Sequence, residues 1–322
     1  MRGSEVANGE VVMKIFAAAI AGATLFFSSL SGANAAPLEV FTCVPEWASL
    51  VKTLGGDRIG TVTLATSPFD NPDNMKPTPA IIAALSKADL MLCTGIGLED
   101  EWLPALMEKA NNPKVAKGKP GYFMAGEYAK VIEEHDDGPA EPGKKEEHGV
   151  HPHVQGDPNN VRLIAGQLAK RLIQLDPEGK EVYTERAKTF IADITALTKE
   201  LVKKAAPLKG TAIVVQHDHS TYLLRWLGIR TGATVEPVPN VPPGPAHLTK
   251  VVDAVSKQKL RFVAYAGYEN PAPSRYVSEQ AKIPLVKIPF TVGGTPEATD
   301  LLNFYKDSVD RLLDGLAGKS RS

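Results

Sequence analysis

Three histidines lie close together in the stretch HGVHPHVQGDPNNV, which runs from His148 to Val161. The whole chain has only 7 histidines, so this clustering raises the question of a metal site. Imidazole nitrogen is a common ligand of zinc and of other transition metals. A histidine-rich loop is nevertheless more often a solvated surface feature than a ligand set. The cluster by itself leaves both interpretations open.

Two further candidate ligands follow predicted strands. His217 comes directly after the apolar run TAIVVQ, and Asp73 lies in the loop SPFDNPDNMKP that follows the run TVTLA. In parallel α/β sheets, ligands bind beyond the carboxyl ends of the strands, where several loops converge. His217 and Asp73 therefore have suitable positions for a binding site, whereas the position of His153, at the end of a loop, is less well defined.

The elements that must position these residues alternate between short apolar runs and helical patterns. Helical patterns follow the apolar runs LEVFTC, TVTLA and ADLMLC early in the chain, and TAIVVQ, the run around Thr234 to Val238, RFVAYAG and LVKI late in the chain. This order is typical of parallel sheets covered by helices. Two helical segments without a strand signal lie between the two series, and the second has apolar residues at helical spacing over roughly 28 residues.

We therefore predict an α/β protein with two similar lobes, each a mainly parallel sheet flanked by helices, joined by a long rigid helix. The predicted parts are an N-terminal lobe over residues 36–157, inter-lobe helices over 158–207 and a C-terminal lobe over 208–322. Residues 133–151 are rich in acids, prolines, glycines and histidines. Because such a segment cannot bury enough apolar surface to fold alone, we predict a mobile loop there.

The amino terminus has the pattern of an export signal. Lys14 provides a positive start, Ile15 to Leu30 form an apolar core, and Ala33-Asn34-Ala35 is a small-x-small cleavage pattern. We predict a signal peptide over residues 1–35 and a soluble periplasmic protein. A membrane anchor is the alternative, but the apolar run is short for a span.

The net charge limits the kinds of binding partner, and the cysteine content limits the kinds of metal site and disulfide. The formal net charge is -1, so the chain lacks the basic field that attracts nucleic acid or anionic lipid, and we expect no nucleic-acid partner. Cys43 and Cys93 are the only cysteines, which excludes a cysteine-rich zinc site and a disulfide framework. Each ends a predicted strand. They could form one disulfide in an oxidising compartment if those strands are neighbours, or remain buried free thiols.

From about Leu38 to Leu316 the chain resembles the periplasmic receptors of ABC importers for zinc and manganese, whose lobes are joined by a rigid helix. The matching stretches are LGGDRIGTVTL, NPDNMKPTPAIIAALSKADL, GIGLEDEW, HPHVQGDPNNVRLIAGQLAKRLIQLDP, VVQHDHSTYLLRWLG and YENP. The resemblance implies a monomeric receptor, not an enzyme, that passes a metal ion to an ABC permease in the inner membrane. An acidic, histidine-rich loop at the place of residues 133–151 marks the zinc members. Zn(II) is therefore the expected ligand, with manganese or copper as alternatives.

The resemblance assigns the metal ligands in part. The family's second and third ligand positions match His153 and His217, whereas Asp73 occupies the first position, where the family usually has histidine. The fourth position follows a late strand, and LVKIPFTVGG has no acid or imidazole there. Water, a loop histidine or Glu269 could fill it. We expect His219 to lie behind the ligands or on the surface.

Two other functions remain open from the sequence. One is a receptor of the same fold with altered metal specificity or another small ligand. The other is a zinc hydrolase, because a catalytic zinc site also combines three protein ligands with an open water position. The chain contains neither an HExxH motif nor a G-x-S-x-G elbow, which disfavours the hydrolase.

Overall fold

The computed structural model describes residues 36–133, 150–238 and 240–322. The predicted signal peptide and most of the predicted loop over residues 133–151 lie outside these ranges. Within them the chain forms two four-stranded sheets, and every strand pair is parallel. The helices in these ranges include none with the length and apolar character needed to span a bilayer.

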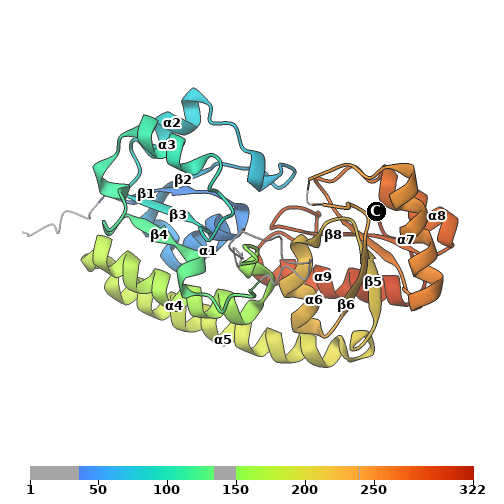
Figure 1. Cartoon of the computed structure of the whole chain (residues 1–322). Coiled ribbons are helices and arrows are strands. Elements are labelled where there is room, and N and C mark those ends of the chain that lie inside the picture. Colours follow the sequence, from blue (N-terminus) through green and yellow to red (C-terminus); the bar gives the residue numbers. More distant parts are fainter. Residues whose placement is uncertain (1–35, 134–149, 239) are drawn as a thin grey trace, which may run out of the picture. The chain divides into compact units, whose positions relative to one another are not determined.

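The first sheet has the strand order β2-β1-β3-β4 (Figure 1). Its elements are β1 (Leu38–Thr42), α1 (Pro45–Gly55), β2 (Ile59–Leu64), α2 (Pro79–Leu85), β3 (Leu90–Cys93), α3 (Leu103–Ala110) and β4 (Tyr122–Met124). The sequence patterns did not predict β4. This strand has three residues, which is too short for any periodicity to be recognised.

The second sheet repeats this topology with the order β6-β5-β7-β8. Its elements are β5 (Ala212–Val215), α6 (Thr221–Leu227), β6 (Arg230–Thr234), α7 (Pro245–Gln258), β7 (Val263–Ala266), α8 (Ala272–Ala281), β8 (Leu285–Ile288) and α9 (Leu301–Leu316). The prediction of a strand around Thr234 to Val238 is wrong in position, because β6 ends at Thr234. Its sequence RTGAT is exposed or half-buried and lacks an apolar pattern, and Pro237 cannot donate a ladder hydrogen bond.

The two sheets are connected by α4 (Pro158–Leu175) and α5 (Lys180–Lys204), which lie side by side (Figure 1). The 25 residues of α5 correspond to a length of about 37 Å. Near its start, Arg186 Nε donates a hydrogen bond of 2.8 Å to the carbonyl of Thr53 in α1. Near its end, Lys204 forms an ion pair with Asp310 in α9. The long connecting helix predicted from the sequence is thus confirmed, and it contacts elements of both sheets.

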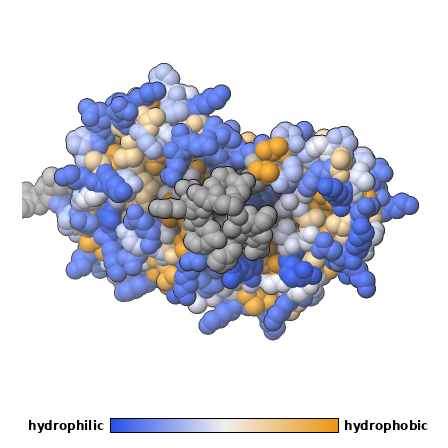
Figure 2. All heavy atoms as spheres, in the orientation of Figure 1, coloured by the Kyte–Doolittle hydropathy of each residue, from blue (hydrophilic) through white to orange (hydrophobic). Residues whose placement is uncertain are grey.

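The apolar core is continuous between the two halves of the chain. One cluster of buried residues includes Trp47 in α1, Ile194 in α5, Ile213 in β5 and Phe304 in α9. Two smaller clusters lie on the opposite sheet faces, beneath α2 and α3 and beneath α7 and α8. Hydrophilic residues cover most of the visible surface that is coloured in Figure 2. This packing fixes the strands whose carboxyl ends carry the candidate ligands.

Cys43 and Cys93 form a disulfide, with their Cα atoms 4.8 Å apart. The two strands that precede and contain them, β1 and β3, are neighbours, and Thr42 pairs with Leu92. The alternative of a bridge between neighbouring strands is therefore confirmed, and the alternative of buried free thiols is wrong.

Replacing both cysteines by serine should lower the free energy of unfolding by about 4 kcal/mol, because the bridge closes a long loop in the unfolded chain. The cysteines are 50 residues apart in sequence. Urea unfolding of the double variant and of the oxidised wild type measures the difference. Equal stabilities of the two proteins would contradict this role of the bridge.

Candidate metal centre

Four histidines gather beyond the carboxyl end of β5. His217 follows this strand, His219 lies in the short helix η8 (Asp218–Ser220), and His151 and His153 precede the short helix η5 (Val154–Gly156). All four are buried, with exposed fractions of 3–6 %. The ring centroids of His217 and His219 are 5.5 Å apart and stacked, and His153 lies 6.3 Å from His219 and 5.7 Å from His151. The two predicted histidine ligands, His153 and His217, therefore belong to one cluster.

Carboxylates from the neighbouring strand ends surround these rings. Glu269 follows β7, and its Oε1 lies 3.5 Å from His219 Nδ1. Glu236 follows β6, and its Oε2 lies 2.9 Å from His217 Nδ1. Asp218 Oδ1 lies 3.3 Å from His217 Nε2. The cluster thus combines imidazole and carboxylate groups, the usual ligands of zinc in proteins that lack cysteine ligands.

Asp73 approaches this cluster from the loop after β2. It lies in the short helix η2 (Pro72–Asn74), and its backbone N–H donates to the side chain of Asn71, the N-cap. Its Oδ2 accepts a hydrogen bond of 3.2 Å from Asn240 Nδ2, and the Asn240 N–H donates to Glu236 Oε2 at 2.9 Å. Asp73 is therefore linked through Asn240 and Glu236 to His217, and it also takes part in a local turn.

Many polar atoms of the cluster are buried without a hydrogen-bond partner among the described residues. They are both ring nitrogens of His151 and His219, Nδ1 of His153 and Oε1 of Glu269. Buried polar atoms normally have partners, so a group of orphaned ones indicates a missing ligand. The residue types fit a metal ion, because unprotonated imidazole nitrogens and a carboxylate oxygen are metal ligands.

The side chains would have to move closer to hold an ion. In the part of the chain that the structure describes, the one set of three potential ligand atoms within 4.8 Å of one another is Cys43, Cys93 and Glu99. The two sulfurs of that set are joined in the disulfide, so it is not a metal site.

Burial sets the protonation states in the cluster. It lowers the pKa of His153 to about 3 and the pKa of His219 well below the ordinary value, and the neighbouring histidines lower both further. Burial also raises the pKa of Glu269 to about 8. The two histidines are consequently neutral at pH 7, the form that binds a metal.

The lowered pKa of His153 predicts that this residue makes the metal-free protein less stable in acid, whereas the raised pKa of Glu269 acts in the opposite direction. An unfolded histidine gains a proton below pH 6.5, whereas folded His153 stays neutral down to about pH 3, so its contribution to stability is present above pH 6.5 and is lost as the pH falls. Between pH 7 and pH 5 the loss from His153 should be about 2 kcal/mol. Urea unfolding at both pH values measures it. The change in the free energy of unfolding between the two pH values should differ by that amount between the wild type and His153→Leu, with the wild type the more weakened by acid. Equal changes in both proteins would contradict the argument.

The structure differs from the sequence analysis at two positions in the cluster. His219 is not on the surface as one alternative had it, because only 3 % of it is exposed. Glu236 was not singled out, since it follows β6, whose sequence lacks an apolar pattern. Its place after a strand of a parallel sheet was the signal that could have identified it.

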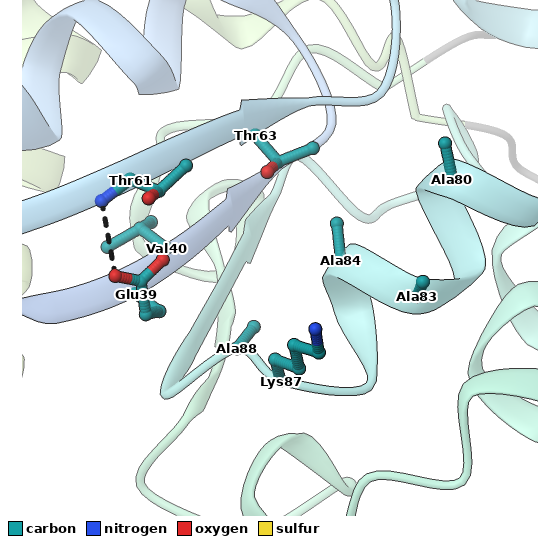
Figure 3. A pocket seen from close by; sticks show the side chains of 9 residues that line it. All are labelled: Glu39, Val40, Thr61, Thr63, Ala80, Ala83, Ala84, Lys87 and Ala88. Atoms are coloured by element: carbon teal, nitrogen blue, oxygen red, sulfur yellow. Dashed lines mark hydrogen bonds between the residues drawn. The ribbon is translucent and has the colours of Figure 1, made fainter.

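A cavity of about 300 Å³ lies away from the histidine cluster, between α2 and the strands β1 and β2 (Figure 3). Alanines of α2 face Thr61 and Thr63 across it, and Glu39 Oε1 accepts a hydrogen bond of 3.4 Å from the Thr61 N–H. Its lining contains no histidine or cysteine. It is therefore a poor candidate for a transition-metal site.

Comparison with known proteins identifies the family. The family model described as "Zinc-uptake complex component A periplasmic" matches residues 40–315. The chain belongs to this family. One relative, the "Manganese ABC transporter substrate-binding lipoprotein scaA" of Streptococcus gordonii, is 26% identical over 297 residues, which cover 90% of this chain and 92% of that protein. The manganese-binding lipoprotein MntA of Halalkalibacterium halodurans is 24% identical over 285 residues, which cover 87% and 89% of the two chains.

Solved structures of the family have the same fold. The crystal structure of ZnuA has a TM-score of 0.71 and 22% sequence identity, with 87% of this chain and 99% of that chain covered. A zinc-bound deletion mutant of ZnuA gives the same TM-score at 20% identity, with 89% and 100% covered. The family model and the names of the relatives together identify the chain as a substrate-binding protein of a metal ABC transporter. The resemblance noted in the sequence and the predicted two-lobed α/β fold are confirmed.

Proposed function

We propose that this receptor captures Zn(II) at the histidine cluster, in the periplasm, and delivers it to the permease of an ABC importer. The observation that carries the proposal is the group of buried imidazole nitrogens without hydrogen-bond partners among the described residues. Nitrogen-rich sites favour zinc and copper, whereas manganese prefers oxygen ligands. Because affinity for divalent metals generally rises from manganese to zinc, and because imidazole suits zinc, a site with two histidine ligands should select zinc over manganese.

Four residues form the proposed ligand set. His153 and His217 provide nitrogen, and Glu269 and Asp73 provide oxygen. Glu269 is favoured by its burial and by its unpartnered Oε1, which lies 3.5 Å from His219. Asp73 is favoured because its Oδ2 accepts a hydrogen bond from Asn240, whose backbone N–H donates to Glu236 beside His217. His219 is the alternative fourth ligand, since it is buried between His153 and His217.

Manganese is the main competing cargo, because several relatives carry that metal in their names. Competition between Zn(II) and Mn(II) for the metal-stripped protein distinguishes the two, with calorimetry as the readout. We expect zinc to displace manganese completely at equal concentration. Retention of manganese would instead favour a receptor with altered metal specificity.

The proposed receptor role also assigns the parts of the chain and the oligomeric state. Residues 36–157 and 208–322 would act as the two lobes, with residues 158–207 as the connection and residues 1–35 as a cleaved signal peptide. A monomer suffices, because the proposed ligands all come from one chain. A zinc hydrolase has less support, because the family consists of receptors.

A further inference from the structure

A second group of unpartnered polar atoms lies beside the histidine cluster. It consists of both carboxylate oxygens of Glu46, Oε1 of Gln155 and Oγ1 of Thr291, none of which has a hydrogen-bond partner among the described residues. The three side chains line one cavity of about 10 Å³. Phe290 lines the same cavity, and its ring also packs against His153 and His219.

The cavity collects residues from both halves of the chain. Glu46 lies in the first turn of α1, Gln155 in η5, and Thr291 follows β8. Asp70, in the loop after β2, also lines the cavity, and it is exposed. The other three residues have exposed fractions of 1–4 %. The volume corresponds to about one water-sized sphere, so the cavity has room for a single ion or water.

The chemistry of these unpartnered atoms is that of a cation site. All of them are oxygens. The Glu46 carboxylate and that of the exposed Asp70, whose Oδ2 accepts a hydrogen bond of 2.7 Å from the Ser67 N–H, would together give the site a formal charge that matches a divalent ion. A buried carboxylate without a partner is costly, and burial raises the pKa of Glu46 to about 7 although the nearby Thr291 hydroxyl lowers it. A bound cation would remove that cost.

Another buried glutamate shows what Glu46 lacks. Glu99 is as deeply buried, and burial raises its pKa to about 7 as well. Its two oxygens, however, accept hydrogen bonds of 2.8 and 2.7 Å from the backbone N–H groups of Thr94 and Gly95. The fold thus satisfies the carboxylate of Glu99 with two backbone donors, whereas Glu46 has the Thr291 hydroxyl nearby but accepts no well-formed hydrogen bond from the described residues.

We propose that this cavity is a calcium site, in which oxygens of Glu46, Asp70, Gln155 and Thr291 hold one Ca²⁺ between the two halves of the chain. Hard cations prefer oxygen ligands, and Ca²⁺ accepts carboxylate, amide and hydroxyl oxygens in flexible geometry. Mg²⁺ usually keeps several water molecules, for which the cavity has no room. Zinc should bind this site more weakly than the histidine cluster, because the site offers carboxylate, amide and hydroxyl oxygens but no imidazole or thiolate.

Titration of the metal-stripped wild type with CaCl2, by calorimetry and by thermal unfolding, tests the proposal. We expect one Ca²⁺ per chain and a rise in unfolding temperature. Glu46→Gln should weaken Ca²⁺ binding by at least about tenfold, because the charge of the ligands sets calcium affinity. Thr291→Val should weaken it less, and Glu99→Gln, the matched control, should bind Ca²⁺ as the wild type does.

Two results would overturn the proposal. One is a wild type that binds no Ca²⁺, in which case the cavity holds a water molecule beside a protonated Glu46. The other is Ca²⁺ binding that is the same in Glu46→Gln as in the wild type. Zinc titration of the same variants keeps the two sites separate, because Glu46→Gln should bind zinc normally and His217→Ala should bind calcium normally.

Discussion

Replacing His217 or His153 by alanine should remove most of the thermal stabilisation that zinc gives to the wild-type protein. A ligand that binds only the folded state stabilises it by about 4 kcal/mol when its concentration is a thousand times the dissociation constant. Each variant loses one of the two imidazoles that we assign to the ion and leaves the other nearby. Thermal unfolding of chelator-stripped protein, with and without excess zinc, gives the stabilisation directly.

His247→Ala is the matched control for these variants. His247 is also a histidine of the C-terminal half, but it lies in the first turn of α7, outside the cluster. Its Nε2 lies 3.0 Å from the carbonyl oxygen of Thr234. This variant should keep the full zinc-dependent shift even if its own stability falls. A wild-type shift in either His217→Ala or His153→Ala would show that the ligand assignment is wrong.

Replacing Asp73 should change which metal is preferred. Asp73→Ala should weaken zinc, copper and manganese together, because each loses a carboxylate ligand. Asp73→His should tighten zinc and copper relative to manganese, since imidazole suits the first two metals and oxygen suits the third. Competition titrations among the three metals measure the order of affinities.

Asp73→Asn separates a ligand role from a turn role. Asparagine is as suitable as aspartate in this turn and can still bond to Asn240, but it removes the negative charge. If Asp73 only shapes the loop, Asp73→Asn should bind all three metals like the wild type. If Asp73 is a ligand, the substitution should weaken binding nearly as much as Asp73→Ala. Unchanged affinities in all three variants would leave His153 and His217 in need of another partner.

The fold could be predicted from the sequence where a strand or helix has its own pattern of apolar residues. LVKI and LLNFYKDSVDRLLDGL are the full lengths of β8 and α9, because an apolar run and a helical repeat define them locally. β4 was missed and β6 was displaced, since a short strand and a partly exposed strand are held by backbone pairing with their neighbours. Pairing between distant segments leaves no periodic pattern in either of them.

The site could be predicted only in part for a similar reason. His153 and His217 are recognisable from their motifs, and the structure places both in one buried cluster. The burial of His219 depends on Phe290, whose ring lies 4.5 Å from it and which follows β8, about 70 residues later in the chain. The contact of Glu236 with His217 depends on the pairing of β5 with β6. Such tertiary contacts decide which polar residues lose their contact with water.

The most direct test of the zinc assignment is anomalous X-ray scattering from crystals of the zinc-soaked, chelator-stripped protein. Data collected on both sides of the zinc absorption edge locate the ion independently of the other atoms. We expect one strong peak about 2 Å from nitrogens of His153 and His217 and from Glu269 Oε1. The absence of a zinc peak at this cluster, with zinc bound elsewhere or not at all, would contradict the proposed capture site.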